Sequence, residues 1–212
     1  MPTKLSVFNG ALRLLGETRM IDADEDNKKG RELRQAWDDV VRGIFESYPW
    51  NCASERVALE RLSDTPAHTY DYYYAKPDDW LRTIALTRSS NEQDKLRLYV
   101  DEAGGEAQPK GRLATSESTV FMRYISEDYL ARIGNWPQNL ADYVSAKLAY
   151  EACQAITGNN SKMDMLYREM SKRRHEATNW DTLQNPPQQL QTGRLVSARL
   201  RGIGRFGRSG GN

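Results

Sequence analysis

The chain has only two cysteines and two histidines among its 212 residues, which limits the kinds of site it can build. Cys52 and Cys153 lie far apart in sequence, and neither has a second Cys or a His at metal-ligand spacing. We expect both to be reduced thiols in a core. His68 and His175 stand outside any G-x-S-x-G or H-E-x-x-H pattern, so we expect solvated histidines, no zinc site and no hydrolytic triad.

Long apolar runs are missing as well. No segment approaches the roughly 18 apolar residues of a membrane span, and the first residues lack the apolar stretch of a signal peptide. We therefore expect a protein that is made in the cytoplasm and has no membrane partner.

A literal G-x-G-x-x-G occurs at Gly202, Gly204 and Gly207, but without the surroundings that phosphate binding needs. The dinucleotide version follows a strand, opens a helix and is followed by an acid about 20 residues later. Only five residues follow Gly207. We expect no cofactor at this motif.

The spacing of Asp22, Asp24 and Asp26 reproduces the first three ligand positions of a calcium loop. The remainder of the pattern fails, because Asn27 stands at the turn glycine and Leu33 at the final glutamate. We expect no metal, and instead expect these acids to interact with the N-terminus of the following helix.

Adjacent acids such as Asp78 with Asp79 could in principle perform acid–base chemistry, but any acidic chain offers such pairs. Nothing in the sequence singles one pair out. We expect no catalytic residues and no enzymatic activity.

The charge is unevenly distributed. With 39% hydrophobic and 28% charged residues, the chain has the composition of a folded protein. Residues 190–212 contain five Arg and no acid, which leaves 25 bases and 29 acids, or a charge of −4, in residues 1–189. An acidic body with a basic end indicates a partner for that end, either nucleic acid or an acidic protein surface.

Helical periodicity appears near both ends of the body. The first apolar stripe follows Thr3 and stops at Gly16, and the second runs from Leu33 to a stop at Tyr48. Two further helices are predicted from Pro137 to Gly158 and over about 161–183.

Between these helices the sequence is strand-like. Residues 69–86, 95–100 and 119–125 are rich in Tyr, Val, Ile and Thr, and residues 101–111 form a Gly- and Pro-containing connection. The prediction is an α+β fold, a small antiparallel helical bundle with a strand-rich insertion between the second and third long helices. We assign 1–49 and 128–184 to the bundle, 50–127 to the β-rich insertion and 185–212 to an extended basic C-terminal tail.

The tail provides the candidate site. Its docking residues are Arg194, Arg199, Leu200, Arg201, Ile203, Arg205, Phe206 and Arg208. Guanidinium groups can bind phosphates, or can pair with carboxylates in a protein groove while apolar side chains fill pockets. The apolar interleaving favours the protein groove, and a solvated disordered tail is the alternative to both.

An ordered set of short motifs carries a family resemblance. The set is Asn9-x-Ala11-Leu12-x-x-Leu15-Gly16-Glu17-x-Arg19-x-Ile21, Trp50-Asn51-Cys52-Ala53, Tyr70-x-Tyr72-x-Tyr74-x-x-Pro77 with Leu81-Arg82, Tyr124-Ile125, Pro137-x-x-Leu140, Leu148-Ala149 and Ile156-Thr157-Gly158. In this order the chain resembles the tail tubular protein A family, the head-to-tail adaptors of short-tailed phages. The likeness spans roughly residues 5 to 181, and the Gly-Arg tail lies outside it.

The resemblance implies a structural virion protein in the neck of the particle. Such adaptors form a ring, expected to be a dodecamer, between the portal protein and a tail nozzle of the tail tubular protein B type. The helices pack neighbour to neighbour, the β insertion faces the tail and the C-terminal segment reaches the portal. The ring seals the head, and DNA passes non-specifically through its lumen. The alternative is a small nucleic-acid-binding protein that uses residues 190–212 as a basic arm.

Overall fold

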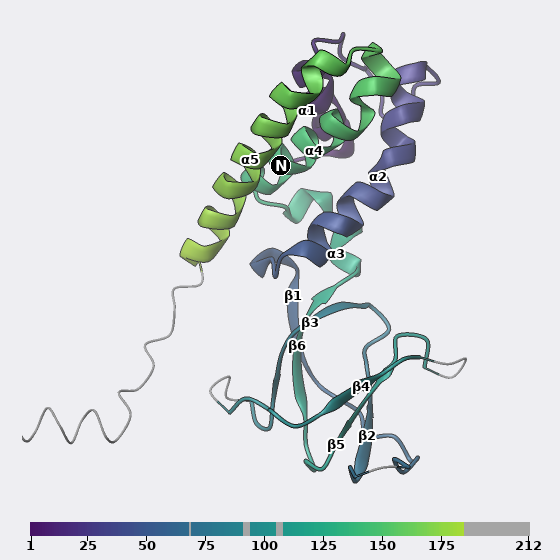
Figure 1. Cartoon of the computed structure of the whole chain (residues 1–212), viewed down its shortest axis with the longest axis vertical. Coiled ribbons are helices and arrows are strands. Elements are labelled where there is room, and N and C mark those ends of the chain that lie inside the picture. Colours follow the sequence, from purple (N-terminus) through teal and green to yellow (C-terminus); the bar gives the residue numbers. More distant parts are fainter. Residues whose placement is uncertain (68, 91–93, 105–107, 185–212) are drawn as a thin grey trace, which may run out of the picture.

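The computed structural model describes residues 1–67, 69–90, 94–104 and 108–184. This part of the chain is a mixed α/β structure with five α-helices and two three-stranded antiparallel sheets. Figure 1 shows the helices gathered at one end of the molecule, hereafter the helical part, and the strands at the other end, the β part.

The first two helices form where the sequence predicts them. Helix α1 (Lys4–Leu15) begins at Thr3, whose side chain accepts from the Ser6 N–H, and it ends at Gly16 in a left-handed conformation with φ of 72°. Helix α2 (Lys28–Ser47) begins at Asn27, whose side chain accepts from the Gly30 N–H. Both helices bury the apolar stripe predicted from their periodicity.

Helix α4 (Gln138–Thr157) is the centre of the helical part. It packs against α1, α2 and α5 (Met163–Gln184), and most of its side chains from Leu140 to Cys153 are buried. Both boundaries predicted for α4 are confirmed, and α5 begins after a short 3-10 turn at Asn160–Lys162. A short helix α3 (Asp128–Ala131), absent from the sequence prediction, leads back from the β part.

Aromatic side chains join the N-terminal helices to the segment before α4. Phe8 meets Trp37 edge-on with ring centroids 5.4 Å apart, and Trp37 stacks on Trp136 at 6.0 Å. Such pairs contribute about 0.5 to 1.5 kcal/mol beyond the area that they bury. Residues from both ends of the chain therefore share one core.

The β part contains two antiparallel sheets, in which most neighbouring strands are not consecutive in sequence. One sheet has the order β1-β6-β3, from β1 (Ser54–Ala58), β6 (Phe121–Ser126) and β3 (Trp80–Thr87). The other has the order β2-β5-β4, from β2 (Tyr72–Ala75), β5 (Arg112–Thr115) and β4 (Val100–Glu102). A smaller core between them includes Leu86, Leu113 and Met122.

The strand predictions need correction. The segment predicted as one strand over 95–100 is mostly irregular, and only Val100 belongs to a strand. The run over 69–86 holds two strands separated at Lys76 and Pro77, and residues 101–111 include the end of β4. Strands β1 and β5 are additional, because their short sequences show no alternation that a pattern could detect.

Candidate functional site

The eight predicted docking residues of the C-terminal segment all lie within 185–212, outside the described residues. The described chain ends just before this region, at Gln184, the last residue of α5 (Met163–Gln184). Helix α5 packs on α4 over its length and is fastened at its C-terminal end by polar contacts.

A buried carboxylate makes the strongest of these contacts. Asp181, in the last turn of α5, is only 3% exposed. Its carboxylate accepts a hydrogen bond from the Asn51 backbone N–H and another from Asn51 Nδ2, each at 3.0 Å. The same Nδ2 donates to the Asp181 carbonyl oxygen at 2.8 Å. Asn51, between α2 and β1, therefore anchors the end of α5.

Asn51 also binds the sheet. Arg123 of β6 donates through Nη2 to Asn51 Oδ1 at 2.9 Å and to Ser54 Oγ at 3.4 Å. One asparagine thus connects α5, the connection that leaves α2, and the central strand of a sheet. We call Asn51, Asp181 and Arg123 the Asn51 junction.

Burial and charge set the protonation of this region. Burial raises the pKa of Asp181, while the Asn51 hydrogen bond and the Arg123 charge oppose that rise. Burial, together with the nearby Asp181 charge, raises the pKa of the Cys52 thiol to about 12. Cys52 is therefore a protonated thiol at neutral pH and not an activated nucleophile.

A second set of contacts spans the same boundary. Glu127, just before α3, accepts from Arg42 of α2 and from Lys110 of the β part, each at 2.6 Å. The Lys110 hydrogen bond is the main cause that lowers the pKa of Glu127, and Arg42 adds to it. Arg82 of β3 donates to the carbonyl oxygen of Glu46 at 2.7 Å. The helical part and the β part are thus joined by charged and polar contacts.

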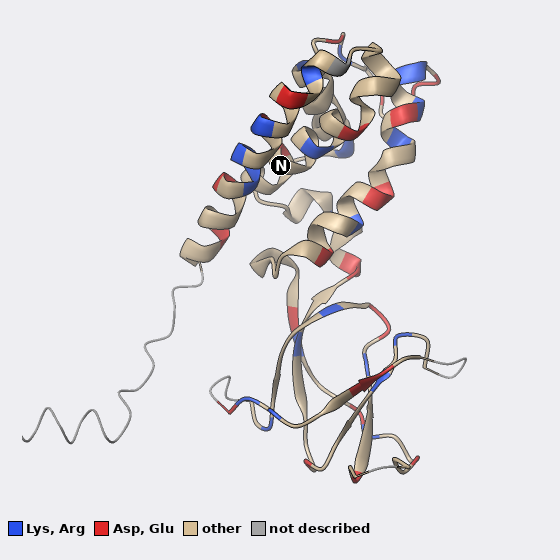
Figure 2. Ribbon diagram, viewed as in Figure 1, with Lys and Arg blue, Asp and Glu red and all other residues tan. Residues whose placement is uncertain are grey.

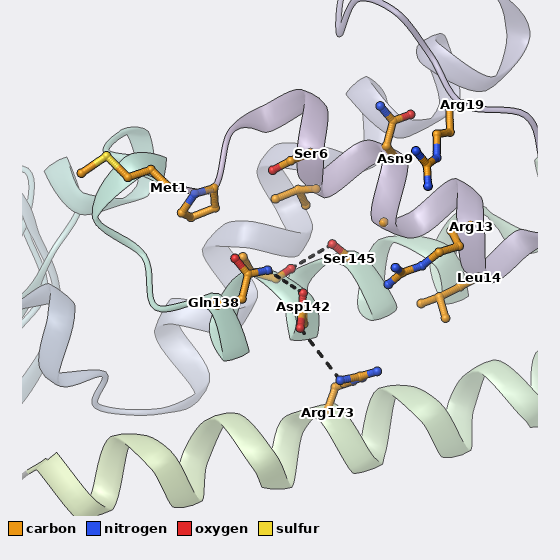
Figure 3. A pocket seen from close by; sticks show the side chains of 14 residues that line it. Met1, Ser6, Asn9, Arg13, Leu14, Arg19, Gln138, Asp142, Ser145 and Arg173 are labelled. Atoms are coloured by element: carbon orange, nitrogen blue, oxygen red, sulfur yellow. Dashed lines mark hydrogen bonds and ion pairs between the residues drawn. The ribbon is translucent and has the colours of Figure 1, made fainter.

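A polar groove of about 420 Å³ lies between α1 and α5, with α4 as its floor (Figure 3). We call it the α1–α5 groove. Its floor is formed by small and apolar residues of α1 and α4, including Gly10, Ala141 and Ser145. A Cβ at Gly10 would lie 2.7 Å from Ser145 Oγ, so the glycine permits the close approach of the two helices.

Three arginines line this groove, Arg13 and Arg19 from α1 and the segment after it, and Arg173 from α5 (Figure 3). Arg173 of α5 is occupied by Glu169 at 2.8 Å and Glu176 at 3.3 Å. Within the described part of the chain, Arg13 and Arg19 form no hydrogen bond or ion pair through their side chains. The groove therefore presents two unpaired cations.

A second groove, of about 530 Å³, lies between α2 and α4, with Arg174 of α5 at its edge. Its apolar lining includes Val40, Ile44 and Tyr143, and its rim carries both signs of charge, with Asp39 and Arg174 among them. Acidic and basic residues alternate along α2 and α5 (Figure 2). This groove has no preference for a ligand of one sign.

Of the adjacent acids Asp78 and Asp79, Asp79 makes hydrogen bonds that hold two strands together. Asp79 accepts from the Tyr124 hydroxyl at 3.0 Å and from the Ser126 hydroxyl, and its carbonyl accepts from the Glu127 N–H at 2.7 Å. Burial, then the bond to Asp79, raises the pKa of Tyr124 well above its ordinary value. Asp79 fastens the beginning of β3 to the end of β6.

The cysteines, histidines and clustered acids considered in the sequence lie as follows. In the described ranges no three His, Cys, Asp or Glu side chains come together as metal ligands. In the acidic segment, Glu25 accepts from the N–H groups of Ile21 and Asp22, and Asp26 pairs with Arg31. Cys52 and Cys153 are both free, and His175 is exposed on α5.

Comparison with protein-family models and with curated proteins finds no match for this chain. No helix in the described ranges is long and apolar enough to cross a membrane. The function must therefore be inferred from the residues and their arrangement.

Proposed function

We propose that this chain is a structural subunit of a phage head-to-tail connector, an adaptor that forms a ring between the portal and the tail nozzle. In this proposal, residues 1–49 and 128–184 form a small antiparallel bundle that packs against neighbouring copies. The β-rich insertion over 50–127 faces the nozzle, and residues 185–212 extend to the portal.

The observation that carries the proposal is the Asn51 junction. In a connector the bundle, the β-rich insertion and the C-terminal segment would each contact a different partner. They would need a fixed mutual orientation, because the portal and the nozzle lie at opposite ends of the ring. Asn51 ties the end of α5, from which residues 185–212 continue, to the sheet that contains Arg123. Glu127 ties α2 to the β part at the same boundary.

The mechanism is mechanical and needs no catalytic residue, metal or cofactor. The ring, a dodecamer by resemblance, seals the head of the virion and lets DNA pass during ejection. Residues 1–189 carry a charge of −4, and a lumen with low affinity for phosphate would let DNA slide. A lumen rich in Lys and Arg in an assembled ring would contradict this account.

Removal of residues 190–212 tests the role of the C-terminal segment. The shortened chain should keep its far-ultraviolet circular dichroism and lose affinity for the portal ring. A chain with the same residues 190–212 in scrambled order is the matched control, because it keeps the charge. Equal portal binding by the full and shortened chains would contradict the docking role, and unfolding would place the segment in the core.

A second function is favoured by the charge of the C-terminal segment. Residues 190–212 contain five Arg and no acid. A small nucleic-acid-binding protein would use these residues as a basic arm. DNA affinity whose salt dependence corresponds to about five phosphates, and which is lost without residues 190–212, would support this alternative.

A further inference from the structure

The α1–α5 groove is lined by three arginines and one carboxylate, that of Asp142. The Asp142 carboxylate already accepts from Gln138 at 2.8 Å and lies 3.9 Å from Arg173. The Ser145 hydroxyl donates to the Ala141 carbonyl. The guanidinium groups of Arg13 and Arg19 have no partner among the described residues. A ligand that fits this groove must therefore supply acceptors and negative charge.

The backbone segments that carry Arg13 and Arg19 are fixed by other contacts. Arg13 lies on the exposed face of α1, in its last turn. Arg19 lies on the segment after α1, which is fixed by a clamp one residue further on. Asn9 accepts from the Met20 N–H at 2.8 Å and donates to the Met20 carbonyl at 3.0 Å, and Met20 is buried. Such preorganisation lowers the entropy lost when a ligand binds.

The acidic segment Ile21–Asp26 of the same chain has the complementary chemistry. Its Glu25 carboxylate is used internally, by the N–H groups of Ile21 and Asp22 and by Asn27 Nδ2. The Asp22 carboxylate accepts from the Asp24 N–H at 3.0 Å, and the side chains of Asp22 and Asp24 are exposed, with no ion pair in the described part of the chain. Ile21 is 92% exposed, an unusual position for a large apolar side chain.

The acidic segment does not line the groove, although it begins two residues after Arg19, which does. The segment crosses the end of the helical part from α1 to the beginning of α2, whereas the groove opens between α1 and α5 (Figures 1 and 3). A contact between two different patches is heterologous, and repetition of such a contact produces a ring or a filament.

We infer that the α1–α5 groove of one copy binds the Ile21–Asp26 segment of a second copy. Arg13 and Arg19 pair with Asp22 and Asp24 of that copy, and its Ile21 contacts the apolar floor of the groove. This inference rests on the proposed ring and names the contact that would build it. A protein segment fits better than DNA, because the groove is concave and partly apolar.

Charge reversal in the full chain tests the contact. Arg13→Glu with Arg19→Glu, or Asp22→Arg with Asp24→Arg, should each weaken self-association at least about tenfold in analytical ultracentrifugation, because like charges then face each other. A mixture of the two variants should recover, since each reversed groove then meets a reversed segment. The matched control is Arg174→Glu, which reverses an exposed arginine of α5 outside the groove and should leave association unchanged.

The outcomes separate this contact from the ring itself. If the wild-type chain forms a ring and both charge-reversed variants still form it, the inference is wrong and the proposed function is unaffected. If the wild-type chain does not assemble even with the portal, the proposed function fails, and the contact is tested with an acetylated peptide of residues 19–28. Amide shifts in the groove on peptide addition, lost in the arginine variant, support the contact. No shifts, or shifts caused only by short DNA, overturn it.

Discussion

Truncation of Asp181 should show whether the Asn51 junction is a real coupling between α5 and the β part. Asp181→Ala removes the acceptor of the half-buried Asn51 N–H, and an unsatisfied buried donor costs about 1 to 3 kcal/mol. Asn51→Ala keeps that N–H but removes the bonds from Nδ2 to Asp181 and from Arg123 to Oδ1. Bonds to charged groups contribute about 1.5 to 3 kcal/mol each, and each variant loses at least two of them, so we expect each to be destabilised by at least about 3 kcal/mol.

The double variant carries the decisive information. If the two side chains act together, its loss should be smaller than the sum of the single losses by about 1 to 2 kcal/mol. Urea unfolding followed by circular dichroism and tryptophan fluorescence gives these values, and Trp50 is a buried reporter next to Asn51. Asn179→Ala, on an exposed position of the same helix, should change stability by less than about 0.5 kcal/mol. Additive losses, or no loss in either single variant, would refute the coupling.

Three further outcomes are expected. Gly10→Ala should lower the free energy of unfolding by about 1 to 3 kcal/mol, because its Cβ meets Ser145. Gly43→Ala, whose Cβ points into open space, should raise it by about 0.5 to 1 kcal/mol. Changes of the same sign for both variants in urea unfolding would contradict the helix packing. Because burial raises the pKa of Asp181, its contribution to stability is full below about pH 4 and falls as pH rises through the raised pKa. The stability of the wild type relative to Asp181→Asn should therefore be constant below about pH 4 and decline as pH rises above it, and a rise would contradict the pKa shift. Cys52, with a pKa of about 12, should resist iodoacetamide at pH 8 in the folded chain, and rapid alkylation would contradict its burial.

The helices could be predicted because their signals are local. Thr3 and Gly16 bound α1 through capping and a left-handed turn, which depend only on nearby residues. Leu33 and Trp37 place the buried side of α2 by their spacing alone. In these elements, periodicity and end signals agree with the packing.

The strands and the junction depend on distant partners. Leu96 is buried while Leu98 is 73% exposed, so the apolar run over 95–100 does not correspond to one side of a sheet. Asn51 and Asp181 are separated by 130 positions, and an asparagine in a turn or an aspartate on a helix is ordinary in sequence. Their hydrogen bonds form only after the chain has folded, so no local pattern could identify them.

Particle mass measured by light scattering, on the purified chain alone and then mixed with its portal ring, tests the proposed adaptor most directly. The account predicts that the portal produces a large assembly of fixed stoichiometry, and that short DNA produces none. A mass that the portal leaves unchanged, while short DNA raises it, would contradict the connector and favour the nucleic-acid-binding alternative.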